Sequence, residues 1–275
     1  MTKTKEVSTT LSADKKALLD QSFPVEQGFT KVALPRLGFY SQDVTEGKGK
    51  AMKVVTEAGT FYKELVTGET DDKGKKVYEK TELGPTIEGI IIYQRRQLKY
   101  YDESSQTFTS SPIFDEDDEI IPLFQNGAEI CRGTAKELKA RPEFQTSKDG
   151  KVFSKLEENQ VLYMLYNEEL YQMTIRGSSM FSYKDYRKEI GNPSSVLTNI
   201  DSEYMEKGSI SWNKMIFSKT RDITDDEFEV VVKSQNDLRT AIKMEKNYYA
   251  SVDSSQPKKA TEEHLAIGGV NPDDF

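Results

Sequence analysis

The sequence predicts a mainly β protein with accessory helices, and three features support this prediction. The stretch 89–101 begins as a β-branched apolar run, which is typical of a long strand. Residues 161–176 and 196–218 each hold two runs of apolar and aromatic residues joined by a short polar turn, which is the pattern of a hairpin. Two further segments, 180–190 and 225 to about 246, carry helical patterns.

The first part of the chain changes character near Phe29. Residues 1–28 are polar and rich in Thr and Lys, and we interpret them as a flexible N-terminal arm. From Phe29 on we expect strands at 31–40, 59–66 and 77–83, the first of them interrupted by Pro35.

The middle of the chain contains the acidic run Asp115-Glu116-Asp117-Asp118-Glu119. It lacks the glycine and the final glutamate that an EF-hand needs in register, so we expect a solvated acidic loop. A site for Mg²⁺ or Ca²⁺ is the alternative. After this run, 134–139 resembles a short helix closed by Arg141 and Pro142, and 147–150 reads as a turn.

The two longer helices have recognisable ends. Ser178 and Ser179 are expected to cap the helix 180–190, and Gly191 to end it. Thr224 and Glu227 form a capping box that opens the helix ending near residue 246. Its apolar face is interrupted by one polar residue, Gln235. Residues 250–275 are rich in Ser, Asp, Lys and Glu, and we expect a disordered acidic tail.

Composition limits the function classes. The 275 residues carry a formal net charge of −8, which argues against nucleic-acid binding unless the cations gather locally. The single cysteine, Cys131, excludes an internal disulfide framework and indicates a reducing cytoplasm, that of the host cell if the protein is encoded by a phage. No apolar run reaches the length of a membrane span, so we expect no membrane association.

The residues that common enzymes use are scarce. His264, in the expected tail, is the only histidine, which excludes a His-based triad or a multi-His metal centre on a rigid site. Cys131 has no histidine partner in the expected folded part. We therefore expect no catalytic residues, no metal and no cofactor. A metal-dependent nuclease that uses the 115–119 carboxylates stays open as an alternative function.

The alternation of the strand 89–101 predicts a nucleic-acid interface. One face would carry Tyr93, Arg95, Lys99 and Tyr101, a mixture of cations for phosphates and rings for bases. Arg96 would lie on the opposite face, and we rank it lower for phosphate contact. The alternative is a long strand with one core face and one ordinary solvated face.

The two hairpins add further aromatic residues. Trp212 is a candidate for base stacking. We expect Tyr163, Tyr166 and Tyr171 to serve in the core or in cross-strand pairs.

The last residues of the sequence suggest a separate binding element. Asp273, Asp274 and Phe275 combine two acids with an aromatic ring. Such an end can insert its ring into an apolar pocket of a partner protein while the acids meet a basic rim. It can also lie in a basic groove of its own chain, and a frayed terminus without function is the alternative.

These pieces resemble the phage-type single-stranded DNA-binding proteins. The end Pro272-Asp273-Asp274-Phe275 is similar to the acidic, Phe-terminated tips of that family, and 161–190 resembles its strand pair followed by an amphipathic helix. The resemblance implies an OB-like barrel, elaborated by hairpins, over residues 29–249. It implies coating of single strands with little sequence preference in replication, recombination or repair, and recruitment of partner proteins by the tail. Whether the protein forms a homo-oligomer is left open.

A different class of function explains the acidic charge better. A β-rich phage structural or assembly protein without nucleic-acid binding would need no basic groove. It explains the basic, aromatic stretch 89–101 and the acidic, Phe-terminated end less well.

Overall fold

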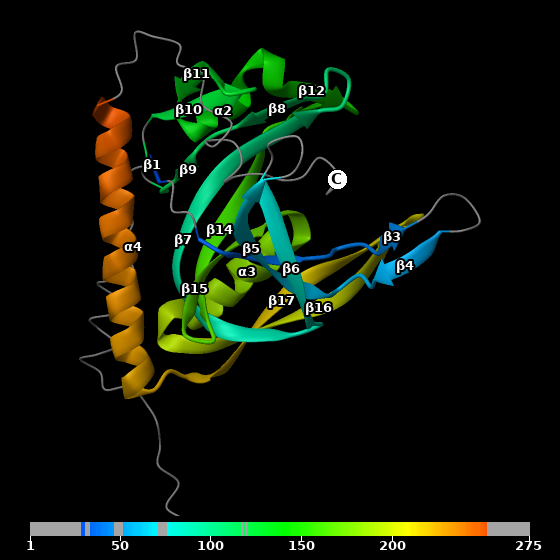
Figure 1. Cartoon of the computed structure of the whole chain (residues 1–275). Helices are drawn as coiled ribbons and strands as arrows, with labels where there is room; N and C mark the ends of the chain where they lie inside the picture. The colour runs from blue at the N-terminus through cyan, green and yellow to red at the C-terminus, as the bar shows by residue number, and fades with distance from the viewer. Residues whose placement is uncertain are drawn as a thin grey trace, which may run out of the picture.

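The computed structural model describes residues 29–30, 34–46, 52–70, 76–116, 118 and 120–251. The described chain is mainly β, as predicted (Figure 1). The expected N-terminal arm and all but the first two residues of the expected tail lie outside it, including Asp273, Asp274 and Phe275.

One large mixed sheet organises the molecule. Its main path runs in the order β11-β10-β8-β7-β14-β15-β2-β5-β6. The strands of this path are β2 (Arg36–Phe39), β5 (Phe61–Thr70), β6 (Lys76–Gly84), β7 (Ile87–Asp102), β8 (Thr107–Ser110), β10 (Ile121–Gln125), β11 (Ala128–Gly133), β14 (Glu157–Tyr166) and β15 (Glu169–Ile175). Among the described strands of this path, only β2 and β15 pair in parallel, and the other pairs are antiparallel.

Short strands and two small hairpins complete the β structure. The pair β1 (Phe29–Thr30) and β9 (Ile113–Phe114) joins the sheet at β7, and so does the hairpin β16 (Val196–Lys207) with β17 (Ile210–Asp222). Separate two-stranded pieces are β3 (Val44–Glu46) with β4 (Lys53–Thr56) and β12 (Gln145–Lys148) with β13 (Lys151–Ser154). In Figure 1 the β3–β4 hairpin projects away from the body of the molecule.

Strand β7 is the centre of this arrangement. It is 16 residues long and pairs with β14, β8, β9 and β16 along its length. Opposite β14 the register shifts between Tyr163 and Met164, so that Tyr163 pairs with Tyr93 while Met164 pairs with Ile91. Such a bulge bends a strand, and β7 arches through the molecule in Figure 1.

Both predicted hairpins are confirmed. Strands β14 and β15 pair in register from Gln160 opposite Ile175 to Tyr166 opposite Glu169. The turn residues Asn167 and Glu168 have φ angles of 50° and 65°, as a two-residue hairpin turn requires.

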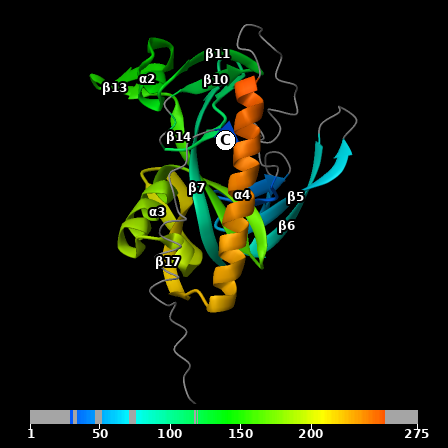
Figure 2. The same ribbon diagram turned by 90° about the vertical axis from the view of Figure 1, so that its left-hand side faces the viewer.

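The described residues form the α-helices α2 (Ala135–Ala140), α3 (Gly177–Ile190) and α4 (Asp225–Ser251), and short 3₁₀ turns span Pro142–Phe144 and Pro193–Ser195. The capping box of α4 is confirmed: the Glu227 N–H donates to Thr224 Oγ1 at 3.2 Å, and the Thr224 N–H donates to Glu227 Oε2 at 2.7 Å. Figures 1 and 2 show α4 running along the sheet beside β7.

The polar interruption on α4 has a structural role. Gln235 is fully buried, and its Nε2 donates to the carbonyl oxygen of Ile92 at 2.9 Å. Ile92 belongs to the β7 segment at the bulge, where the strand ladder is irregular. The glutamine therefore satisfies a backbone acceptor that an apolar residue would leave unpaired.

The expected serine cap of α3 is wrong. Its N-cap is Arg176, in extended conformation and without a side-chain cap bond. Ser178 Oγ instead accepts from Trp212 Nε1 at 3.1 Å, and Ser179 Oγ accepts from the Met215 N–H at 2.9 Å. The two hydroxyls thus tie α3 to β17, while Gly191, with a φ of 76°, ends the helix as predicted.

Three apolar clusters hold these elements together. The first packs α3 and the β16–β17 hairpin onto the sheet and includes Ile91, Leu162 and Tyr183. The second packs α4 against Ile92 and Tyr163. The third, with Leu98, lies under α2 and the β10–β11 pair.

Candidate nucleic-acid interface

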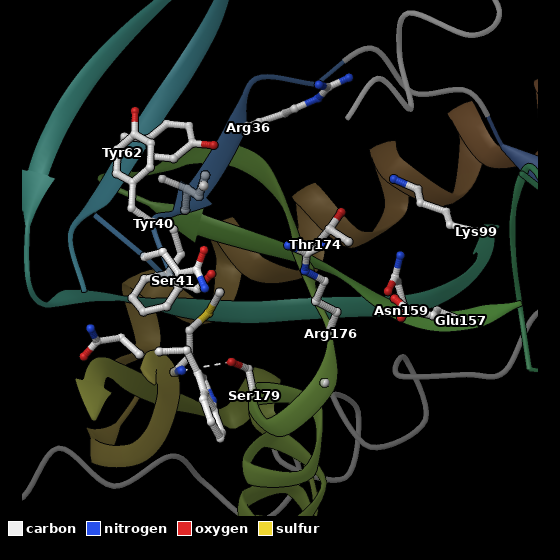
Figure 3. A pocket seen from close by; sticks show the side chains of 18 of the residues that line it. Arg36, Tyr40, Ser41, Tyr62, Lys99, Glu157, Asn159, Thr174, Arg176 and Ser179 are labelled. Carbon is white, nitrogen blue, oxygen red and sulfur yellow. Dashed lines mark hydrogen bonds between the residues drawn. The ribbon is translucent and has the colours of Figure 1, made fainter. Parts of the chain in front are cut away.

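A groove with a volume of about 1370 Å³ opens between the sheet, the start of α3 and the β16–β17 hairpin. Figure 3 shows its side chains arriving from several elements around one open space. Five cations line it: Arg36, Lys80, Lys99, Lys155 and Arg176. Six aromatic rings line it: Phe39, Tyr40, Tyr62, Tyr100, Tyr101 and Trp212. Four carboxylates also line it: Asp43, Glu64, Glu103 and Glu157.

Cross-strand pairs build the floor of this groove. Residues directly opposite each other on neighbouring strands share one face of a sheet. Opposed pairs that line the groove include Gln97 with Asn159, Lys99 with Glu157, Gln172 with Arg36, Arg36 with Glu64, and Glu64 with Lys80. A polar face of six strands, from β7 to β6, therefore runs along the groove.

Lys99 is the most buried cation of the groove, with 7% of its surface exposed. Burial first, and then the nearby charges of Arg36 and Arg176, together lower the pKa of its ammonium group to about 7. The neutral and charged forms of Lys99 are therefore comparably populated near neutral pH.

The aromatic rings of the groove are held in defined positions. The Tyr40 and Tyr62 rings lie 4.4 Å apart between centroids, and Lys80 Nζ stands 4.8 Å from the Tyr62 centroid. A Cβ added at Gly38 would lie 2.0 Å from Tyr62 Cζ, so glycine is required for this ring to lie across β2. Half-buried rings held in this way lose little freedom when they contact a ligand.

The structure corrects the expectation for Tyr93 and Arg95. Tyr93 is 2% exposed and belongs to the apolar cluster under α4. The Arg95 side chain is fully buried, and its Nε donates to Asp115 Oδ1 at 2.8 Å. Neither residue lines the groove, so neither is accessible to a strand in this conformation.

Arg96 lies apart from the groove, as the alternation predicted. Its guanidinium pairs with Glu116, and its Nη1 also lies 3.0 Å from Glu158 Oε1. Both pairs are partly exposed, and each places a carboxylate beside the guanidinium. Arg96 is therefore poorly suited to phosphate contact. The predicted residues that do meet in one site are Lys99, Tyr101 and Trp212.

The acidic run at 115–119 is only partly described by the structure, and its first residue differs from the expected solvated loop. Asp115 is 2% exposed and is the ion-pair partner of Arg95. Asp117 and Glu119 lie outside the described residues. Within the described part of the chain, no group of three or more His, Cys, Asp or Glu residues is arranged to hold a metal ion.

Sequence reasoning missed several residues of the groove, most clearly Arg36, Arg176, Tyr40 and Tyr62. Arg36 reaches the site because β2 pairs in parallel with β15, a contact between segments about 135 residues apart that no local pattern predicts. A usable signal was Gly38, since a glycine inside a strand often marks the close approach of another group.

Among the described residues, no helix is long and apolar enough to cross a membrane. Comparisons of the chain with models of protein families, with curated proteins and with solved structures found no match.

Proposed function

We propose that the protein binds single-stranded DNA in the groove, with little sequence preference. The observation that carries this proposal is the meeting of five cations and six aromatic rings in one groove. Cations neutralise phosphates and rings stack on bases of any sequence, which is the combination that single strands require.

The acidic charge of the whole chain does not oppose this proposal. The chain carries a net charge of −8, yet the groove lining has five cations against four carboxylates. One of these carboxylates, Glu64, already lies 3.3 Å from Arg36 and 3.7 Å from Lys80. The charges of the groove lining therefore nearly balance, in contrast to the −8 of the whole chain, and affinity follows the local surface.

The groove also suggests how a strand would lie. Lys99 and Arg176 would contact phosphates, and Tyr101 and Trp212 would stack on bases at either side of them. The pair of Tyr40 and Tyr62 offers a further stacking surface, with Lys80 beside it for the next phosphate. Arg96, Tyr93 and Arg95 have no part in this arrangement.

The finer parts of the expected function belong to the same proposal. We propose that the curved sheet around the groove serves as an OB-like barrel does, by offering a hollowed β surface to the strand. We also propose that Asp273, Asp274 and Phe275 recruit replication or recombination proteins. A role in replication, recombination or repair follows from coating of single strands.

Fluorescence anisotropy of a labelled mixed-sequence single strand tests the proposal. The protein is titrated at low and moderate salt, with a duplex of the same length as the control. We expect tight, salt-sensitive binding to the single strand and weak binding to the duplex. The slope of log affinity against log salt should be about −0.7 for each phosphate contacted. Absence of binding to the single strand at low salt, also after deletion of residues 268–275, would favour the structural or assembly role.

A further inference from the structure

Three cations of the groove come from three separate elements and face the same hollow. Arg36 begins β2, Lys99 lies in the second half of β7, and Arg176 stands immediately before α3. Figure 3 shows the three side chains around one open space. The Arg36 and Arg176 charges both act on Lys99, so the three groups share one electrostatic environment.

The three cations differ in burial, so the cluster extends from the surface into the groove. Lys99 is 7% exposed, the Arg36 side chain is 22% exposed, and Arg176 is at the surface. A buried lysine at the base and an arginine at the mouth form a pocket that an anion can enter from solvent. Burial strengthens the attraction between such a lysine and an entering anion, because the local dielectric constant is low.

The start of α3 adds partial positive charge to this pocket. Gly177, Ser178 and Ser179 line the groove together with Arg176. No side chain caps the first turn at Arg176, and the hydroxyls of the two serines bind β17. The first-turn amides and the helix dipole therefore favour an anion at this end of the groove.

The carboxylates near the pocket do not cancel its charge. Glu157, opposite Lys99 on β14, is exposed, and Glu64 on β5 pairs with both Arg36 and Lys80. The other charged or titratable lining groups near this end of β7 are Tyr101, Glu103 and Lys155. Burial and the charges of Arg36 and Arg176 lower the pKa of the Lys99 ammonium group.

We propose that Arg36, Lys99 and Arg176 form a phosphate subsite within the groove, and that a phosphate entering it brings a proton onto Lys99. The inference rests on the proposed function in that a phosphodiester of the bound strand is its ligand. The recognised chemistry is the phosphate group itself, so a free phosphate ion is a second source of the same ligand.

The proton coupling has a defined sign. A bound phosphate stabilises the charged form of Lys99 and raises its pKa above about 7. Above that pH the free protein must take up a proton to bind, so affinity falls as pH rises. Below it Lys99 is already charged, and affinity depends little on pH. Between about pH 6 and about pH 8.5 we expect a loss on the order of tenfold.

Isothermal titration calorimetry of the full chain with a single-stranded oligonucleotide tests this subsite. Measurement near pH 8 in buffers of different ionisation enthalpy gives the number of protons taken up. Wild type should take up about one proton more than Lys99→Arg, whose guanidinium stays charged at every pH used. All other titrating groups, His264 among them, are the same in both proteins. Equal proton uptake by the two proteins would overturn the proposal.

Two further variants separate the phosphate subsite from strand binding as a whole. Lys99→Met removes the charge, and Arg176→Gln removes a charge at an exposed position, where we expect little effect on the fold. Each should weaken oligonucleotide binding several-fold and make it less salt-sensitive. If wild type and both variants bind the strand equally, the subsite is wrong while the proposed function stands.

Inorganic phosphate serves as a probe that needs no strand. It should raise the melting temperature of wild type and have little effect on Lys99→Met. If this shift occurs but no oligonucleotide binds, the subsite stands and single-strand binding is wrong. If a control strand with uncharged methylphosphonate linkages binds as tightly as normal DNA and phosphate causes no shift, the subsite is wrong.

Discussion

The two halves of β7 carry similar residues but have opposite roles. Tyr93 and Arg95 lie in the part that we count as the first half, residues 87–95, inside the core under α4 and against Asp115. Lys99 and Tyr101 lie in the second half and line the groove. Both halves alternate cations with rings on the same face of the strand.

The difference lies in what covers each half. Strand β9 and the residues after it bring a carboxylate over Arg95, and α4 brings an apolar face over Tyr93. Lys99 is also largely buried, at 7% exposed, but it lines the groove. Alternation along a strand thus predicts which residues share a face, while neighbours distant in sequence decide whether that face is core or surface.

The largest effect should come from breaking the buried ion pair. Asp115→Asn leaves the Arg95 charge buried without its carboxylate and should cost about 3–5 kcal/mol of the free energy of unfolding. Urea denaturation measures this cost. The matched control is Glu116→Gln, which breaks a partly exposed pair with Arg96 and should cost less than about 1 kcal/mol. Equal costs in the two variants would contradict the assignment of the first half to the core.

Removal of the Lys99 charge should have the next largest effect, raising stability while lowering affinity for the single strand. The folded state lowers the pKa of Lys99 from 10.5 to about 7, so the unfolded chain binds more protons between these values. The resulting penalty is fully present below about pH 7 and fades as pH rises toward about 10. Lys99→Met should therefore raise the free energy of unfolding at neutral pH, by roughly 2–4 kcal/mol.

Urea denaturation of wild type and Lys99→Met at several pH values checks this prediction. The gain in the variant should shrink as pH rises, while its affinity for the single strand stays below that of wild type. A variant that is less stable than wild type at neutral pH would show that Lys99 contributes to the fold and is not held at a cost for binding.

A smaller effect should separate groove rings from other exposed rings. Tyr101→Ala should weaken single-strand binding by about 1–3 kcal/mol if the ring stacks on a base. Tyr204→Ala is the control, because Tyr204 is 61% exposed on β16 and does not line the groove. Anisotropy titrations of both variants give the comparison. A similar loss in both would place the strand outside the groove.

The smallest effect should come from Arg96, the cation on the opposite face of β7. Arg96→Gln removes a guanidinium that pairs with Glu116 and Glu158 outside the groove. Its effect on strand affinity should be below about 0.5 kcal/mol. A loss comparable to that of Lys99→Met would show that the strand also contacts the opposite face of β7.

Much of the local structure could be predicted from the sequence. The two hairpins, the capping box at Thr224 and the stop at Gly191 depend on residues close together in the chain, and all of them are confirmed. Gln235 stood out as a polar residue on an apolar helix face, and its bond to Ile92 explains it.

The rest depends on contacts that local patterns do not encode. The serines before α3 bind β17 and do not cap the helix, because β17 offers partners that are 34 and 36 residues away. Arg36 joins the groove only through the parallel pairing of β2 with β15. Of the six residues predicted for nucleic-acid contact, Lys99, Tyr101 and Trp212 share the groove, whereas burial removed Tyr93 and Arg95 and strand alternation separated Arg96.

Photocrosslinking of a single strand that carries 5-iodouracil tests the central claim most directly. Irradiation joins this base to aromatic side chains in contact with it, and mass spectrometry identifies the linked residues. We expect crosslinks to groove rings such as Tyr101, Trp212 and Tyr40, and none to Tyr93. Crosslinks concentrated on Tyr93, or on exposed rings outside the groove such as Tyr204, would contradict the division of β7 into a core half and a binding half.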